Sequence, residues 1–139
     1  MDKSKILFFM IPRQKVIHVF DDFTLEEALC VMKSTRFSAI PILSRDNKYI
    51  GTLSEGDILW FIKSIPGFSF ENTETLKIMD IPRLRDNDPV NINCNIEILI
   101  SRAINENYIP VLDDDNQFMG IITRKEIINY FFEHKFVVL

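Results

Sequence analysis

The stretch Gly51-Thr52-Leu53-Ser54-Glu55-Gly56-Asp57-Ile58-Leu59 occurs twice in this chain. Its second form is Gly120-Ile121-Ile122-Thr123-Arg124-Lys125-Glu126-Ile127-Ile128. Each copy has a glycine, two mostly apolar residues, a hydroxyl residue, an acidic residue three positions later and then the apolar spacing of a helix. The two glycines lie 69 positions apart (120 − 51), and the hydroxyl and acidic residues keep that spacing.

A second pair of segments has the same spacing upstream of the first. Ile40-Pro41-Ile42-Leu43 corresponds to Ile109-Pro110-Val111-Leu112, and a polar turn follows each. A period of half a chain with only two copies is typical of a tandem duplication, because solenoids need about three or more repeats. We therefore expect two repeat units, residues 1–70 and residues 71–139.

Composition limits the class of protein. The 139 residues are 47% hydrophobic, enough for a buried core, and their net charge of −4 argues against a nucleic-acid partner. No apolar run reaches the roughly 20 residues that cross a bilayer, so no membrane partner is expected. Cys30 and Cys94 fit neither a zinc spacing nor a disulfide framework and are typical of reduced cysteines in a cytoplasmic protein.

Local patterns predict the elements of the first repeat. A short helix is expected over residues 3–10 and a short strand over residues 15–20. Thr24 and Glu27 have the spacing of a capping box, so a helix should begin there. The remaining elements are strands at 37–43 and 49–53 and a helix capped by Ser54, with Ile58, Phe61 and Ile62 facing inward.

The second repeat predicts the same order of elements after an irregular connector at residues 64–74 and a helical turn at 76–79. Its first helix, capped by Asn95, begins 71 rather than 69 positions after its counterpart (96 − 25), so two residues are missing between helix and strand. The apolar tail at 136–139 is expected to pack on a neighbouring surface. Strands are expected at 90–92, 108–112 and 118–122. The helix capped by Asn95 should have Ile96, Leu99, Ile100, Ala103 and Ile104 inward. A last helix, capped by Thr123, should have Ile127, Ile128 and Phe131 inward.

A doubled strand–helix–strand–strand–helix unit with these two motifs resembles the cystathionine β-synthase (CBS) domain. The resemblance covers essentially the whole chain and implies an α+β fold, a tandem pair of CBS units packed with pseudo-two-fold symmetry and known as a Bateman module. It also implies a regulatory role, because members of the family bind AMP, ADP, ATP or S-adenosylmethionine in clefts between the two units. No cofactor is implied, and any output would pass through a separate, unidentified regulated protein.

The resemblance assigns ligand contacts to both copies of the turn. Asp57 would bond ribose hydroxyls, because an ionised carboxylate is purely an acceptor and such bonds are strong. Ser54 and Thr123 would donate to ribose or phosphate at helix N-termini, which favour an anion. The base would lie against the strands at Ala39-Ile40 and Tyr108-Ile109, whose backbone groups would read its edge.

The two copies differ at positions that matter for ribose and phosphate. Glu126 stands where the first copy has Asp57, and its extra methylene would crowd a ribose. Arg124 can bond a phosphate bidentately, whereas Glu55 at the equivalent position would repel it. We therefore expect a less phosphorylated ligand in the first copy. Three arginines before the short strands are either further phosphate contacts or solvated surface charges: Arg13, Arg83 and Arg85.

Two readings of these residues stay open. Ser54 with Asp57, and Thr123 with Glu126, also have capping-box spacing, which requires no ligand. The chain is then either a nucleotide sensor or a structural dimerisation and interaction module with empty clefts. Catalysis is not expected, because no nucleophile and base occur as a set. A metal is not expected either, since the acidic run at 113–115 lacks the spacing of a calcium loop.

Two aromatic helix segments predict self-association. Trp60-Phe61-Ile62 and Tyr130-Phe131-Phe132 carry more large apolar side chains than one inward helix face requires. A symmetric two-fold contact would bury both sets. We therefore expect a homodimer, as the resemblance also implies.

Overall fold

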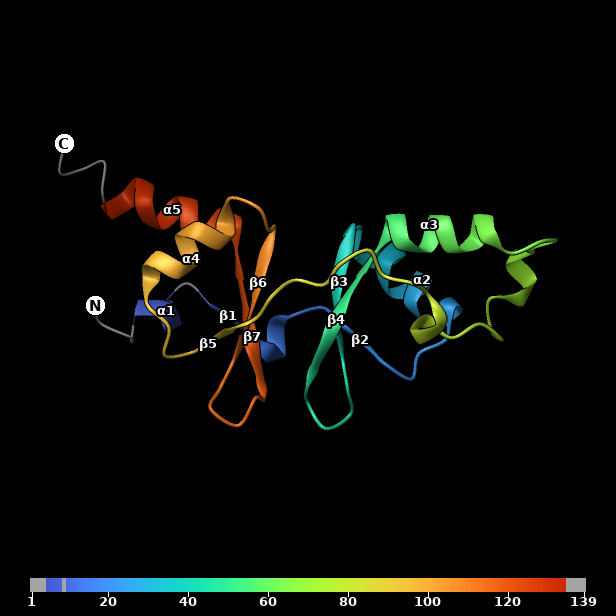
Figure 1. The fold of residues 1–139 in the computed structure, drawn as a ribbon, viewed down its shortest axis with the longest axis horizontal. Helices are drawn as coiled ribbons and strands as arrows, with labels where there is room; N and C mark the ends of the chain where they lie inside the picture. The colour runs from blue at the N-terminus through green and yellow to red at the C-terminus, as the bar shows by residue number, and fades with distance from the viewer. Residues whose placement is uncertain (1–4, 9, 135–139) are drawn as a thin grey trace. The chain divides into compact units, whose positions relative to one another are not determined.

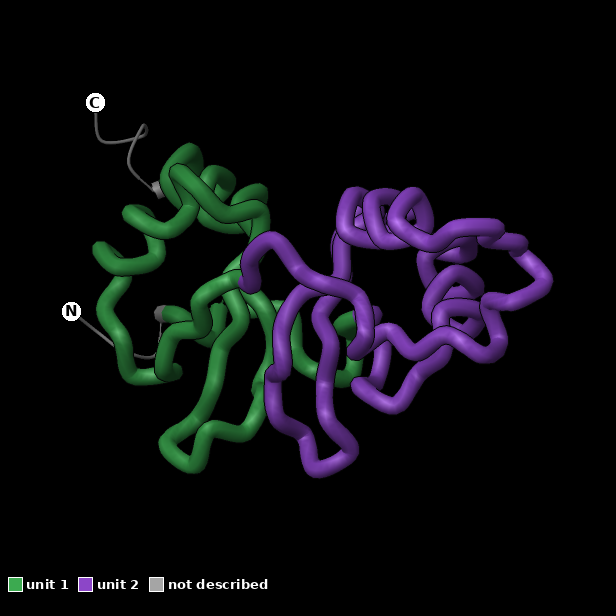
Figure 2. The backbone as a smooth tube through the Cα atoms, turned by 45° about the vertical axis from the view of Figure 1, so that its right-hand side comes forward, with its two compact units in different colours: residues 1–16, 87–139 green, residues 17–86 purple. Residues whose placement is uncertain are grey.

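The computed structural model describes residues 5–8 and 10–134, which form five α-helices and two sheets (Figure 1). They group into two compact units (Figure 2). We call them the 17–86 unit and the 87–139 unit, the latter including residues 1–16. These boundaries differ from the repeat boundary after residue 70, which stays a prediction about the sequence.

The 17–86 unit is a three-stranded sheet with two α-helices. The strand order is β2-β3-β4, with β2 parallel to β3 and β3 antiparallel to β4. The parallel pair needs a crossover, which α2 provides. The elements are β2 (Val19–Phe20), α2 (Leu25–Thr35), β3 (Ala39–Leu43), β4 (Tyr49–Ser54), α3 (Glu55–Ser64) and the 3₁₀ turns η2 (Phe70–Asn72) and η3 (Ile78–Asp80).

The 87–139 unit repeats this plan and adds a strand from the N-terminus. The strand order is β1-β7-β6-β5, and β1 is antiparallel to β7. Helices α4 and α5 pack on β6 and β7 and on each other (Figure 1). The elements are α1 (Lys5–Phe8), β1 (Ile11–Pro12), η1 (Arg13–Lys15), β5 (Val90–Asn91), α4 (Ile96–Ala103), β6 (Tyr108–Leu112), β7 (Phe118–Thr123) and α5 (Arg124–His134).

The two hairpins preserve the duplication residue by residue. Ala39 pairs with Ser54 and Tyr108 with Thr123, and both ladders shift register one residue before their turn. Asn47 and Asn116 hold the corresponding turn positions with φ of 67° and 60°. Asparagine tolerates this left-handed conformation better than most residues, because its short side chain bonds locally. The predicted hairpins are therefore confirmed.

Helix starts follow the predicted caps. The Thr24 Oγ1 accepts from the Glu27 amide at 3.2 Å, and the Glu27 carboxylate accepts from the Thr24 amide at 2.9 Å, which completes the capping box. The Asn95 side chain accepts from the Ile98 amide at 3.2 Å at the start of α4. Each bond satisfies an amide that the first helical turn would otherwise leave unpaired.

The core of each unit lies between its sheet and its helices. In the 17–86 unit Leu25, Ile40 and Leu53 are fully buried, and in the 87–139 unit Leu99 and Ile122 are. The predicted inward positions Ile58, Ile96 and Ile127 are buried, while Phe61, Ile62, Ile100, Ala103 and Phe131 are partly buried.

Two predicted core positions are wrong. Ile104 is 76% exposed because α4 ends at Ala103, so the helical stripe stops before it. Ile128 is 57% exposed because it lies one residue after the buried Ile127, about 100° further around α5.

Some predicted elements also differ in extent. The strand expected over 15–20 pairs only at Val19–Phe20, because Lys15 belongs to the 3₁₀ turn η1 and residues 16–18 are in neither a helix nor a strand. The helical turn expected at 76–79 occurs as η3, Ile78–Asp80. The predicted packing of residues 136–139 lies outside the described residues.

Candidate functional site

The first copy of the repeated turn places Ser54 at the junction of β4 and α3. The Ser54 Oγ accepts from the Asp57 amide at 3.1 Å, and the Glu55 amide donates to the Ser38 carbonyl at 2.9 Å. Ser54 is also the last residue of β4, opposite Ala39. Sheet and helix therefore both fix the position of this hydroxyl.

The Asp57 carboxylate does not complete a capping box. At Thr24 both halves of the box are present, whereas at Ser54 the described residues show only the serine half. The Asp57 Oδ1 accepts instead from the Leu84 amide at 3.1 Å. The capping alternative thus accounts for Ser54 but not for the Asp57 side chain.

The segment that carries Leu84 is clamped to β4. The Arg83 guanidinium donates to Asp86 at 2.8 Å (Nε to Oδ1) and at 3.3 Å (Nη2 to Oδ2). The Asp86 Oδ1 also accepts from the Thr52 amide at 2.9 Å. Burial alone would raise the pKa of Asp86, but the bonds from Arg83 and Thr52 and the charge of Arg83 outweigh it and lower the pKa below its usual value. Arg83 is therefore engaged within its own unit.

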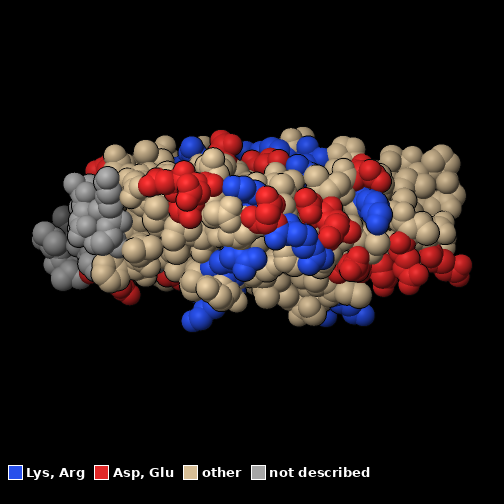
Figure 3. Space-filling view, turned by 90° about the horizontal axis from the view of Figure 1, so that it is seen from below, with Lys and Arg blue, Asp and Glu red and all other residues tan. Residues whose placement is uncertain are grey.

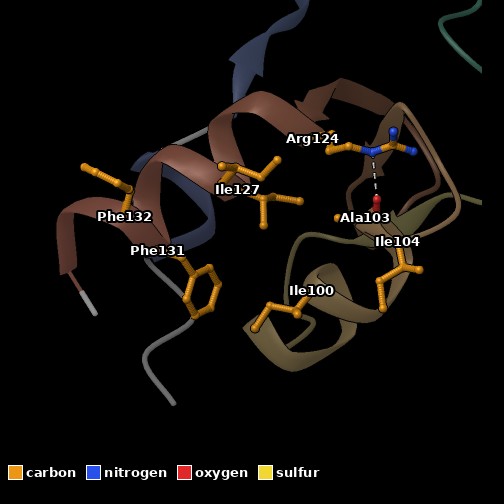
Figure 4. A pocket seen from close by; sticks show the side chains of 8 residues that line it. Ile100, Ala103, Ile104, Arg124, Ile127, Phe131 and Phe132 are labelled. Atoms are coloured by element: carbon orange, nitrogen blue, oxygen red, sulfur yellow. Dashed lines mark hydrogen bonds between the residues drawn. The ribbon is translucent and has the colours of Figure 1, made fainter. Parts of the chain in front are cut away.

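The second copy of the turn repeats the cap. The Thr123 Oγ1 accepts from the Glu126 amide at 3.3 Å, and the Arg124 amide donates to the Asn107 carbonyl at 3.0 Å. The Arg124 Nε donates to the Ala103 carbonyl at 2.8 Å, so its guanidinium reaches toward the end of α4 (Figure 4). A phosphate contact by Arg124 would have to share the guanidinium with this bond.

The strand residues expected to face a base lie at the starts of β3 and β6. Ile40 and Ile109 are buried in the two cores, so their side chains are committed to packing. The Tyr108 carbonyl accepts from the Asn87 side-chain amide at 2.7 Å. One carbonyl predicted to read a base edge therefore already has a donor, and we find no equivalent bond to Ala39 among the described residues.

An apolar groove of about 360 Å³ runs between α4 and α5 (Figure 4). Arg124 lies at one end, and Phe131 lies toward Ile100 at the other. Because the lining is almost wholly hydrocarbon, the groove suits an apolar side chain better than a nucleotide. Its lining residues are Ile100, Ala103, Ile104, Arg124, Ile127, Ile128, Phe131 and Phe132.

The distribution of charged and metal-binding side chains limits the kinds of ligand and partner that the described residues can bind. On the face drawn in Figure 3, acidic and basic side chains are interspersed. Within residues 5–8 and 10–134 there is no group of three or more His, Cys, Asp or Glu suited to a metal. In the same part of the chain no helix has the length and apolar character to span a membrane.

Three participants in these networks escape prediction from the sequence: the Leu84 amide, Asp86 and Asn87. A backbone amide carries no residue-type signal, and Asp86 lies 34 positions from its Thr52 partner. One signal was available, because a glycine inside a strand often marks close approach of another segment. A Cβ on Gly51 would lie 2.4 Å from the Asp86 Oδ1.

Comparisons with known proteins agree with this architecture. A Bacillus subtilis protein named cyclic di-AMP receptor B is 31% identical over 131 residues, 91% of this chain and 85% of that protein. The crystal structure of Listeria monocytogenes CbpB in complex with c-di-AMP has a TM-score of 0.82 at 28% identity, covering 96% of this chain and 98% of that one. Another CbpB structure from Listeria monocytogenes has a TM-score of 0.77 at 30% identity, covering 90% and 97%.

The family comparison explains the duplication. The model of the CBS domain family matches residues 9–64 and again residues 83–133. Each match contains one hairpin and the helix after it. Because the matched residues make up well over half of the sequence, this chain belongs to the CBS domain family.

Proposed function

We propose that this chain is a non-enzymatic regulatory module that senses cyclic di-AMP. The proposal rests on the position of the Asp57 carboxylate and on the group that it bonds. Asp57 stands beside a helix N-terminus capped by Ser54, and its side chain is not used in that cap. An ionised acceptor at this place suits a ribose hydroxyl, and the helix N-terminus suits a phosphate.

Similarity to proteins named for this ligand supports the choice of nucleotide. The Bacillus subtilis relative is named a cyclic di-AMP receptor, and the Listeria monocytogenes structure holds c-di-AMP. Cyclic di-AMP contains two adenosines joined by two phosphodiesters, so it carries two negative charges and one free hydroxyl on each ribose. AMP, ADP, ATP and S-adenosylmethionine are the competing ligands of the same adenosine class.

The remaining features of the proposal concern the surroundings of the module. The chain forms a homodimer, favoured by the exposed Trp60 and Phe132 on α3 and α5. It acts in the cytoplasm on a separate regulated protein. The second candidate function, a structural interaction module without ligand, is favoured by the apolar groove between α4 and α5.

Calorimetric titration with cyclic di-AMP, the four competing ligands and adenosine tests the proposal. We expect Asp57→Ala to weaken cyclic di-AMP binding by roughly tenfold or more, because a hydrogen bond to a charged group contributes about 1.5–3 kcal/mol. Glu126→Ala should cost less, since the longer side chain suits a ribose poorly. Arg124→Ala should weaken ATP binding more than adenosine binding.

Glu97→Ala is the matched control, because Glu97 also lies in the first turn of a helix but outside the repeated turn. It should leave affinity unchanged. If no adenosine compound binds the wild-type chain, the structural alternative stands. If Asp57→Ala and Glu126→Ala both bind the ligand as wild type does and only lower thermal stability, these two acidic residues act as helix caps.

A further inference from the structure

The segment 83–86 forms a bracket that is tied to β4 through Asp86 and closed by an ion pair between Arg83 and Asp86. Asp86 bonds the Thr52 amide and receives two bonds from Arg83, whose side chain is only 18% exposed. Gly51 makes the close approach possible, since a Cβ there would overlap the Asp86 carboxylate. The Arg83–Asp86 ion pair therefore closes the turn that contains Leu84, and Asp86 ties this turn to β4.

Leu84 itself has no packing role that explains this placement. Its side chain is 91% exposed, the highest value among the large apolar residues described. Its amide, by contrast, donates to the Asp57 Oδ1 at 3.1 Å. The part of Leu84 with a defined partner is thus the backbone N–H, and the partner is the predicted ribose acceptor.

The corresponding segment of the other copy has a different form. Ile11–Pro12, which repeats the Ile81-Pro82 pair, forms β1 against β7, and η1 follows it directly. Within the described residues no donor is recorded for the Glu126 carboxylate. Among the described residues, a backbone amide therefore orients the Asp57 carboxylate, and the Glu126 carboxylate has no such donor.

The geometry points to the Leu84 amide as the positioning group of the Asp57 carboxylate in nucleotide binding, an inference that rests on the proposed function. The amide occupies one lone pair of Oδ1 and holds the side-chain torsion. The Oδ2 atom stays available for the single free hydroxyl on a ribose of cyclic di-AMP. Pre-orientation removes part of the entropy cost of ordering the carboxylate when the ligand binds.

Leu84→Pro tests this inference, because proline lacks the N–H. Leu84→Ala is its matched control, since it keeps the amide and removes only an exposed side chain. We expect Leu84→Pro to raise the dissociation constant for cyclic di-AMP by about tenfold, and Leu84→Ala to leave it within about twofold. Asp86→Asn, which weakens the bracket but keeps the amide, is the second variant if Leu84→Pro fails to fold.

A double-mutant cycle separates positioning from general damage to the fold. In the Asp57→Ala background, Leu84→Pro or Asp86→Asn should cause no further loss of affinity, although any loss of thermal stability should persist. The 2′-deoxy analogue of cyclic di-AMP should bind the Leu84→Pro and Leu84→Ala chains equally.

The outcomes distinguish this inference from the proposed function. If wild type binds cyclic di-AMP and Leu84→Pro binds it as tightly as Leu84→Ala, positioning by the amide is wrong and the proposed function stands. Positioning by the amide is also wrong if Leu84→Pro lowers the affinity for cyclic di-AMP as much in the Asp57→Ala chain as in wild type. If wild type binds no adenosine nucleotide, both fail.

Discussion

At the scale of the residue, the two glycines that begin the repeated turns do more than allow a tight backbone. Gly120 faces β1, where a Cβ would lie 2.1 Å from the Ile11 carbonyl oxygen. Gly51 faces the bracket, where a Cβ would lie 2.4 Å from Asp86. The repeat thus preserves a glycine because a different segment crosses the strand in each copy.

Gly120→Ala should destabilise the chain by about 1–3 kcal/mol, because the Ile11 backbone must move to admit the methyl group. Gly56→Ala is the control, since its Cβ would meet nothing nearer than 3.9 Å. In helix α3 that change should raise stability by up to about 1 kcal/mol. Urea unfolding curves measure both. Equal effects of the two substitutions would show that the contact between Gly120 and Ile11 is unimportant.

At the scale of the element, the bracket is tied to the sheet by a carboxylate with a lowered pKa. Burial works against ionisation of Asp86, but the Arg83 and Thr52 bonds prevail. A group whose pKa is lower in the folded state stabilises the fold when ionised. Its contribution is therefore complete above the unfolded pKa and is lost as pH falls through the folded pKa.

We predict that Asp86→Asn lowers the free energy of unfolding at pH 7 and has a diminishing effect as the pH falls below about 4. Denaturant unfolding at a series of pH values gives the difference between variant and wild type. Asp80→Asn, an exposed change in the nearby turn η3, should have little effect at any pH. A difference for Asp86→Asn that is constant from pH 7 to pH 2.5 would contradict the ion-pair explanation.

At the scale of the whole molecule, apolar side chains on α3 and α5 remain outside both cores. Trp60 and Phe132 are 68% and 67% exposed. The groove between α4 and α5 adds a concave apolar surface beside Phe132. Exposed patches of this kind commonly mark contacts with another protein.

We predict that the purified chain is a homodimer by light scattering at tens of micromolar. Trp60→Glu combined with Phe132→Glu should shift it to monomer, because the charges would have to be buried in the contact. Phe70→Ser is the control, as Phe70 is 70% exposed but belongs to η2 rather than to α3 or α5. A monomeric wild-type chain, or a dimer that survives the double substitution, would refute this assembly.

The sequence by itself determined the duplicated hairpins, the helix caps and the place of the candidate site. These features depend on residues a few positions apart, such as Thr24 with Glu27, or Asn116 in its turn. Their chemistry is local, so the pattern of residue types is sufficient. Ser54 and Asp57 were found in the same way, because the turn that contains them occurs twice in the sequence.

Only the tertiary structure decided which segments meet. It pairs β1 with β7, more than 100 positions apart, and it places the Leu84 amide on Asp57, 27 positions away. It also leaves Ile104 and Ile128 exposed, although their spacing suggested a core. Such contacts depend on how distant segments pack and on where a helix ends, and a backbone donor such as Leu84 N–H has no signature in residue type. The candidate acceptor was therefore visible in the sequence, but the group that orients it was not.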